Sequence, residues 1–195
     1  ESVERAIQRL RPKLRSLLAA RLVKLTLNPG SSRLALQVTM APIGGTQVVA
    51  SAFTVRGTAT TPPPRSGIQQ IALGTSIQFE IQNQENRDLY LSVLVIDATG
   101  EMAVIFPNQW TAATEVTRIG AGQTLRLPDP SRDSFRLVTQ APTGPTEVLV
   151  VASSQPLDNA LRALQAVATR SGTASGPVAV ADPTDVVSGL LTDVS

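Results

Sequence analysis

The chain contains no cysteine and no histidine among its 195 residues. Without cysteine it has no disulfide, no thiolate nucleophile and no cysteine ligand for zinc or an iron–sulfur cluster. Without histidine, the usual proton shuttle near neutral pH and the commonest transition-metal ligand are also missing. We therefore expect a chain that is not itself an enzyme and that binds no metal or cofactor.

Aromatic residues are also scarce, at 3%, although hydrophobic residues make up 42% of the chain. The core must therefore consist mainly of Val, Leu, Ile and Ala, a composition that suits strands. The longest apolar runs, such as residues 89–96, are far shorter than the roughly 20 residues of a membrane-spanning helix. The length fits one domain with appended segments.

The first residue is Glu1 rather than methionine, and no charged-then-apolar leader follows it. A processed product or a piece excised from a longer protein would begin in this way, and we favour the excised piece. With no signal peptide or transmembrane segment visible in this stretch, the cytoplasm is the favoured compartment, but the sequence leaves it open.

Residues 1–28 have the pattern of an amphipathic helix, because apolar residues recur at intervals of three and four. These are Val3, Ile7, Leu10, Leu14, Leu17, Leu18, Leu22 and Leu25. Pro12 lies inside the pattern, and proline removes a helical hydrogen bond. We expect a kink, or a second helix that starts there.

This helix is basic, since residues 1–24 hold seven basic and two acidic side chains, whereas the rest of the chain holds 10 and 13. Such a helix can bind a membrane, a nucleic acid or an acidic protein surface. It lacks the interleaved aromatics that would favour the first two, so we expect it to pack against a neighbouring protein domain. The candidate interaction residues are Arg5, Arg9, Lys13, Arg15, Arg21 and Lys24.

Most of the remaining chain predicts strands. We expect a strand pair in residues 29–56, a stiff proline-rich connector in 57–67 and a domain of closely spaced short strands in 68–157. The predicted fold is mainly β: an antiparallel immunoglobulin-like β-sandwich with the N-terminal amphipathic helix and a short C-terminal helix. That second helix is predicted for residues 158–170, and residues 171–195 have the composition of a flexible linker and tail.

Two strands carry clear patterns. In residues 76–82 Ile77, Phe79 and Ile81 alternate with polar residues, which places Glu80 on the wet face. Residues 89–96 are nearly all apolar, which is typical of a central strand covered on both faces. The following Asp97-Ala98-Thr99-Gly100 predicts a hairpin turn rather than the Asp-Thr-Gly of an aspartic protease, because it carries an extra residue and has no second copy.

Other candidate chemistry is incomplete. A serine nucleophile would need lysine as its base, and Lys13 and Lys24 both lie in the N-terminal helix. The loop at residues 129–133 spaces oxygen ligands like the start of a calcium loop, but Ser134 replaces the required glycine and Gln140 the bidentate glutamate. Gly120-Ala121-Gly122 precedes a strand pattern rather than a helix, so it predicts a turn and not a phosphate site.

Phe106, Asn108 and Trp110 form one further candidate interaction site, because two of the six aromatic residues stand here at a strand exit. An exposed ring at this turn could anchor a peptide or glycan. The alternative, which we favour in so aromatic-poor a chain, is that the rings plug one end of the core.

Three stretches follow one another along the chain: residues 74–83 (GTSIQFEIQN), 89–97 (LYLSVLVID) and 105–108 (IFPN). In this order they resemble a bacterial domain of unknown function that typically follows caspase-like peptidase domains. Further similarity lies in residues 120–128, 135–137 and 144–153. The resemblance spans about residues 67–157. Residues 9–14, 17–20 and 31–34 look like the segment that joins such a domain to its peptidase.

The resemblance implies a parent similar to metacaspases or orthocaspases, whose Cys–His dyad lies in the peptidase portion. It predicts an accessory domain that positions substrate, restrains the peptidase or recruits a partner, with the peptidase domain in cis as its partner. The alternative is a free-standing peptide- or glycan-binding module of the cell envelope that uses residues 106–110. Membrane association through the basic helix is a third, less favoured hypothesis, nucleic acid is not an expected partner, and the oligomeric state stays open.

Overall fold

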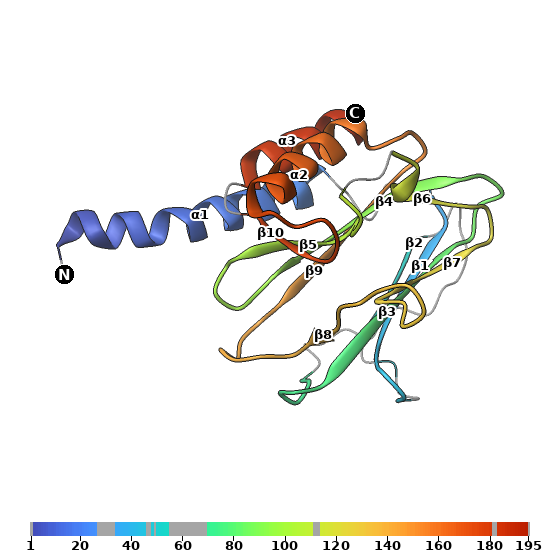
Figure 1. Cartoon of the computed structure of the whole chain (residues 1–195), viewed down its shortest axis with the longest axis horizontal. Helices are drawn as coiled ribbons and strands as arrows, with labels where there is room; N and C mark the ends of the chain where they lie inside the picture. Colours follow the sequence, from blue (N-terminus) through green and yellow to red (C-terminus); the bar gives the residue numbers. More distant parts are fainter. Residues whose placement is uncertain are drawn as a thin grey trace. The chain divides into compact units, whose positions relative to one another are not determined.

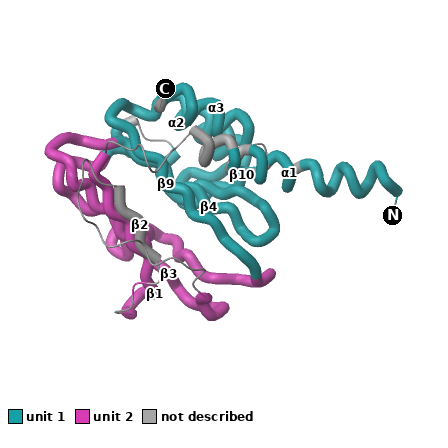
Figure 2. Tube along the Cα trace, turned by 180° about the vertical axis from the view of Figure 1, so that it is seen from behind, with its two compact units in different colours: residues 1–27, 90–118, 144–195 teal, residues 28–89, 119–143 magenta. Residues whose placement is uncertain are grey.

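The structure is a computed structural model that describes residues 2–26, 34–45, 48, 50–54, 70–110, 114–180 and 183–194. These residues form mainly β structure, with two antiparallel sheets and a few helices (Figure 1). The chain divides into two compact units, coloured separately in Figure 2. Unit 1 comprises residues 1–27, 90–118 and 144–195, and unit 2 comprises residues 28–89 and 119–143.

Unit 2 is built on a five-stranded antiparallel sheet in the order β2-β1-β3-β7, with β8 also paired to β3. Its strands are β1 (Leu36–Pro42), β2 (Ala50–Thr54), β3 (Ser76–Asn83), β7 (Thr124–Leu127) and β8 (Leu137–Val138). The strand pair expected in residues 29–56 is present as β1 and β2. The proline-rich connector expected at 57–67 lies outside the described residues.

The alternation in β3 has the predicted orientation. Phe79 and Ile81 are buried, and Glu80 faces the other side of the sheet with its side chain 46% exposed. There Glu80 pairs with Arg126 directly across the ladder, at 2.8 Å between Oε1 and Nε. This exposed pair contributes little to stability, about 0–1 kcal/mol, so Glu80 belongs to the surface as expected.

Unit 1 holds most of the second sheet, in the order β10-β5-β4-β6, with β9 also paired to β4. Its strands are β4 (Leu89–Ile96), β5 (Met102–Phe106), β6 (Arg118–Ile119), β9 (Glu147–Ser153) and β10 (Val178–Val180). A short 3₁₀ helix, η1 (Thr114–Thr117), directly precedes β6. β4 is buried at consecutive positions, including 91–94, which confirms a central strand covered on both faces.

Residues 97–100 form the predicted turn between β4 and β5. The Asp97 carboxylate accepts hydrogen bonds from the Thr99 amide and hydroxyl and from the Glu101 amide, at 2.7–2.9 Å. Gly100 has a φ of 81°, a left-handed conformation that glycine adopts without strain. Desolvation raises the pKa of Asp97, but these hydrogen bonds outweigh it and hold the pKa below its ordinary value. The carboxylate thus stabilises the turn.

Two helices complete the core of unit 1: α2 (Asp158–Ser171), at the site of the expected short helix, and α3 (Pro183–Val194). Leu161 and Leu164 of α2 are buried, as are Val186 and Leu190 of α3. With the exception of Leu161, these side chains join one apolar cluster with residues of β4, β5, β9 and β10. Burial of each such side chain stabilises the fold by about 1.5–3 kcal/mol.

The two helices approach closely at Gly189. A β-carbon there would lie 2.9 Å from backbone atoms of Asn159 and Ala160, so only glycine fits without displacing a helix. One turn further on, the Asp193 carboxylate accepts hydrogen bonds from the amides of Asn159 and Ala160, at 3.2 and 2.8 Å. Asp193 therefore caps the first turn of α2, whose own N-cap residue, Leu157, offers no side-chain acceptor.

We predict that Asp193→Ala destabilises unit 1 by about 0.5–2 kcal/mol, the usual cost of a lost helix cap. The amides of residues 159 and 160 lose their acceptor, so their hydrogen exchange, followed by NMR, should accelerate more than that of the α2 centre. Ser188→Ala, an exposed change on the same helix, is the control and should leave the exchange unchanged. Equal exchange rates in the two variants would contradict the capping role.

The structure corrects the prediction of a flexible linker and tail at residues 171–195. β10 pairs with β5 through the register Val178↔Val104 to Val180↔Met102, and α3 packs on α2. The prediction was wrong because the Ser-Gly-rich stretch is short and its backbone is paired. The Trp110 amide donates to the Ala174 carbonyl at 3.1 Å, and the Gly176 amide donates to the Asn108 carbonyl at 2.8 Å.

The N-terminal segment forms a single helix, α1 (Val3–Thr26). A second helix does not start at Pro12, because the element continues through that position. Proline removes one backbone hydrogen-bond donor, but the other hydrogen bonds of this 24-residue helix are enough to keep the backbone helical at Pro12. In Figures 1 and 2 the first turns of α1 extend away from the rest of unit 1.

Candidate interaction helix

The apolar face of α1 is exposed. Six large hydrophobic side chains of the helix are between 46% and 76% accessible: Val3, Ile7, Leu10, Leu14, Leu17 and Leu18. By contrast, α2 and α3 bury their leucines in the core of unit 1. Scattered exposed leucines are ordinary on protein surfaces, but a continuous apolar stripe along a helix marks a binding face.

The stripe is narrow and regular. Val3, Ile7, Leu10, Leu14 and Leu17 follow one another at spacings of four and three residues, which are the a and d positions of a heptad. On a helix that turns about 100° per residue, these side chains share one face, with Arg11 and Lys13 at its two borders. Arg5 lies on the opposite face. An apolar stripe of this width can be covered by one partner helix or by one groove.

The predicted basic residues surround this stripe. Arg5, Arg9, Arg15 and Arg21 are exposed and Lys13 is half-buried. Lys24 lies in the last turns of the helix, and its side chain is outside the described part. α1 carries seven basic residues and one acidic residue, Glu4, so its surface has a strong positive potential.

The middle of α1 is held by its own unit. A β-carbon on Gly100 would lie 3.7 Å from Cβ of Lys13 and 3.9 Å from Cγ of Leu17, so the β4–β5 turn lies beside the helix. α1 also packs against α3. The helix is thus anchored along part of its length while most of its apolar stripe stays exposed.

The second candidate site, at the exit of β5, is not a surface. Phe106, Asn108 and Trp110 are only 4–6% exposed, and Trp110 joins the apolar cluster of unit 1. The indole Nε1 donates to the Gly176 carbonyl at 2.9 Å. This confirms the interpretation that the rings plug the core, and the peptide- or glycan-binding alternative loses the exposed aromatic anchor on which it rested.

The calcium-like loop uses its carboxylates internally. Asp129 accepts from the amide and hydroxyl of Ser131, at 2.9 and 2.7 Å, and from Arg132 Nε at 3.0 Å. The Asp133 carboxylate accepts from the Asp129 amide at 2.7 Å. The hydrogen bonds from Ser131 and the nearby Arg132 charge hold the pKa of Asp129 below its ordinary value. The loop is a self-contained turn.

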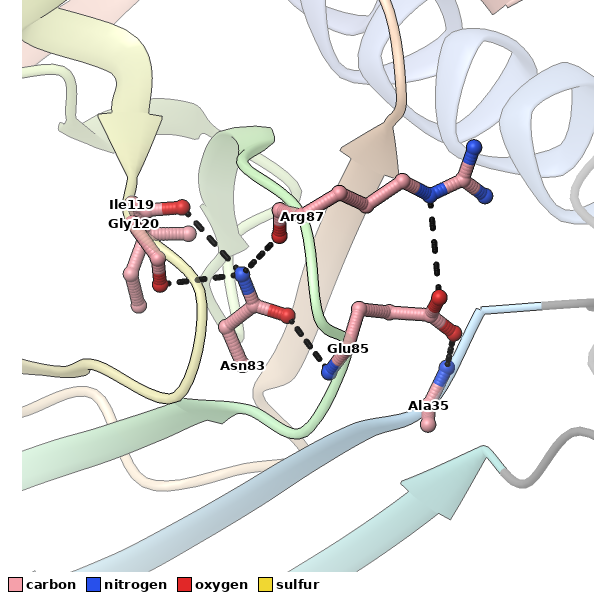
Figure 3. A network of polar contacts seen from close by, with 6 residues as sticks. All are labelled: Ala35, Asn83, Glu85, Arg87, Ile119 and Gly120. Atoms are coloured by element: carbon pink, nitrogen blue, oxygen red, sulfur yellow. Dashed lines mark hydrogen bonds and ion pairs between the residues drawn. The ribbon is translucent and has the colours of Figure 1, made fainter.

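Sequence reasoning did not identify the polar network around Asn83 at the end of β3 (Figure 3). The fully buried Asn83 amide donates to the carbonyls of Arg87, Ile119 and Gly120, at 2.8, 3.2 and 3.0 Å. Its Oδ1 accepts from the Glu85 amide at 2.9 Å. Asn83 therefore ties the turn after β3 to the loop before β7, where Gly120-Ala121-Gly122 forms the predicted turn.

Glu85 extends the same network. Its carboxylate is nearly buried and accepts from the Ala35 amide at 2.7 Å, and its second oxygen lies 3.6 Å from Arg87 Nε. A buried carboxylate is a common signature of a catalytic site. Here both oxygens already have partners within unit 2, so Glu85 fixes the start of β1 to the turn after β3.

Within the described ranges no group of three or more carboxylates is placed to hold a metal ion. In the same part of the chain every buried side-chain nitrogen or oxygen has a hydrogen-bond partner. Among the helices of that part, none combines the length and apolar character needed to cross a bilayer. Of the ten large hydrophobic side chains that are exposed in the described residues, six lie on α1.

Comparison with known proteins identifies the central part of the chain. Residues 70–156 match the family described as Domain of unknown function (DUF4384). This span agrees with the resemblance at residues 67–157, contains β3 to β9 and ends just before α2. No curated protein and no solved structure gives a significant match to the chain.

Proposed function

We propose that this chain is a non-catalytic accessory module of a caspase-like cysteine peptidase, which acts through its surfaces by positioning substrate, restraining the peptidase or recruiting a partner. The observation that carries the proposal is the exposed, basic and apolar helix α1, anchored to unit 1 but with most of its stripe uncovered. The domain of unknown function at residues 70–156 is consistent with it. So is the resemblance of residues 9–14, 17–20 and 31–34 to a segment that joins such a domain to its peptidase.

The chemistry of the described residues supports action by contact. The common forms of nucleophilic catalysis at neutral pH pair a serine or cysteine nucleophile with a histidine base, and the sequence has neither cysteine nor histidine. The carboxylates of Asp97 and Asp129 accept hydrogen bonds within their own turns, and the Glu85 carboxylate accepts one from the Ala35 amide at the start of β1. An immunoglobulin-like β-sandwich is part of this proposal, and the two antiparallel sheets of the described residues are consistent with it.

The proposal predicts that the chain changes the activity of the caspase-like domain encoded beside it. The resemblance to metacaspases implies that this domain, produced separately, cleaves peptides after Arg or Lys. Adding this chain should change the affinity of the domain for a peptide inhibitor by about fivefold or more, the lower end of the usual coupling between two binding sites, with a matching change in cleavage rate. Titration calorimetry measures binding in parallel. A neighbouring gene segment without a caspase-like His and Cys, or inertness in both assays, would contradict the proposal.

A further inference from the structure

We propose that α1 docks into an apolar groove of a protein partner whose rim carries carboxylates, with Val3, Ile7, Leu10 and Leu14 on the floor and Arg11 at the rim. Lys13 and Leu17 lie at the end of the stripe that is beside the β4–β5 turn. This inference rests on the proposed function only in so far as the chain acts by contact. It specifies that α1 is the element that docks, and that the partner's surface is an apolar groove bordered by carboxylates.

The regular spacing of the stripe favours a structured protein partner. Side chains at a and d positions insert between the side chains of a facing helix or groove. Leu10 and Leu14 lie near the centre of the stripe and are 46% and 62% exposed. They are therefore the residues whose burial against a partner should contribute most.

The charges of the helix define the rim of the partner. Arg11 and Lys13 flank the stripe on its two sides, and Glu4 is the single acidic residue of the helix. Charges beside an apolar seam decide which partner it accepts, because opposite charges attract and like charges repel. A second copy of α1 would bring basic borders together, whereas glutamates or aspartates along a groove would complement them.

A bilayer fits the same helix less well. Interfacial helices have a broad apolar face that often includes Trp or Phe, and α1 contains no aromatic residue. The exposed Arg21 also continues the a/d series after Leu17, where a membrane-bound face would need an apolar side chain. The regular stripe from Val3 to Leu17 thus spans about two heptads, a length suited to a protein groove.

The test uses the whole 195-residue chain and two synthetic helical peptides of about three heptads, both with leucine at a and d. One peptide has glutamate at e and g, and the other has lysine there. Binding is followed by the fluorescence anisotropy of the labelled peptides. We expect the acidic peptide to bind, with an affinity that falls as salt is added, and the basic peptide not to bind.

Matched variants of the chain localise the interaction. Leu10→Gln with Leu14→Gln should weaken binding of the acidic peptide at least about tenfold, since two buried leucines are lost. Arg11→Glu at the border of the stripe should weaken it about twofold to fivefold. Arg5→Glu makes the same charge change on the opposite face of α1 and should have a smaller effect than Arg11→Glu.

Three results would overturn the inference. They are equal binding of the two peptides, stripe-dependent co-sedimentation with phosphatidylserine-containing vesicles in place of peptide binding, and stripe-dependent self-association in sedimentation velocity. Far-UV circular dichroism checks that each variant folds. A chain that alters peptidase activity but fails to bind the acidic peptide would contradict this docking chemistry alone and leave the accessory function standing.

Discussion

Trp110→Ala should lower the free energy of unfolding of unit 1 by about 3–5 kcal/mol, the cost of removing a large buried aromatic side chain. Trp110 is 4% exposed and belongs to the apolar cluster formed by β4, β5, β9, β10, α2 and α3. Its indole also donates to the Gly176 carbonyl, so the substitution removes packing and leaves an acceptor unpaired.

The effect should extend to the C-terminal segment. The backbone of residues 108–110 pairs with that of residues 174–176, and the Trp110 indole adds a hydrogen bond to the Gly176 carbonyl. In the alanine variant, limited proteolysis should cut between α2 and β10 under conditions that leave the parent chain intact. Urea denaturation followed by circular dichroism and hydrogen exchange in unit 1 measures the loss of stability.

Two other substitutions separate packing from hydrogen bonding. Trp110→Phe keeps most of the apolar volume but loses the indole donor, so its cost should be smaller, about 1–3 kcal/mol. Leu73→Ala changes an apolar side chain that is 55% exposed and should be nearly neutral. If Trp110→Ala were no more destabilising than Leu73→Ala, the ring would not hold this part of unit 1 together.

Asn83→Asp is the second substitution with a large expected effect. It puts a carboxylate where an amide now donates to three carbonyl oxygens and, like the asparagine, it would be fully buried. Burial and the facing carbonyls both disfavour the ionised form, so the pKa of the introduced carboxyl rises in the folded state. Unit 2 should lose several kcal/mol near neutral pH, because an unpaired buried charge is costly.

The sign of the pH dependence follows from that raised pKa. Below about pH 3.9 the carboxyl is protonated in both the folded and the unfolded variant, and it can still donate one hydrogen bond. As pH rises, the unfolded chain ionises first, so the variant loses stability progressively until the folded carboxyl also ionises. Urea midpoints of the variant and the parent chain, compared from pH 3 to 7, should therefore diverge as pH increases.

Gln82→Glu provides the matched control for this experiment. It introduces the same charge one residue earlier in β3, on an exposed side chain. Its urea midpoint should stay close to that of the parent chain across the whole pH range. A similar loss of stability in both variants, or a gap between Asn83→Asp and the parent chain that does not widen with pH, would contradict the role assigned to the network in Figure 3.

Much of the strand pattern could be predicted from local sequence. In β3 the two-residue alternation around Phe79 and Ile81 assigns one apolar face, and in β4 the continuous apolar run indicates a strand buried on both sides. The turn at residues 97–100 was also predictable, because aspartate followed by threonine and glycine has well-known turn chemistry. These features depend on residues close together in the chain.

The order of the C-terminal segment could not be predicted in this way. Residues 171–177 look flexible by composition, and their pairing partners at 108–110 lie more than sixty residues earlier. Asp193 gave no local signal either, since it caps a helix that starts 35 residues before it. In sequence Asn83 resembles any other polar residue at a strand end, because its structural role depends on hydrogen bonds to carbonyls of a loop 36 residues further along the chain.

The candidate site was predicted in part. Spacing and charge identified α1 and its basic residues, since both are local properties of a helix. The aromatic pair was more difficult, because a ring at a strand exit can face solvent or the core, and burial of Phe106 and Trp110 depends on which later segment covers them. Trp110 packs in one cluster with residues of α2, β10 and α3, and local patterns predicted only the first of these three elements.

The core of unit 1 has a consequence for proteins that share only the stretch matching residues 70–156. In this chain, α2, β10 and α3 lie beyond that stretch, yet they cover apolar residues of β4, β5 and β9 such as Leu94, Val104 and Val151. A protein that ended at the position equivalent to residue 156 would expose these apolar residues of β4, β5 and β9 to solvent. It would need another segment or a bound partner to cover these residues, because a large exposed apolar surface is a site of association in water.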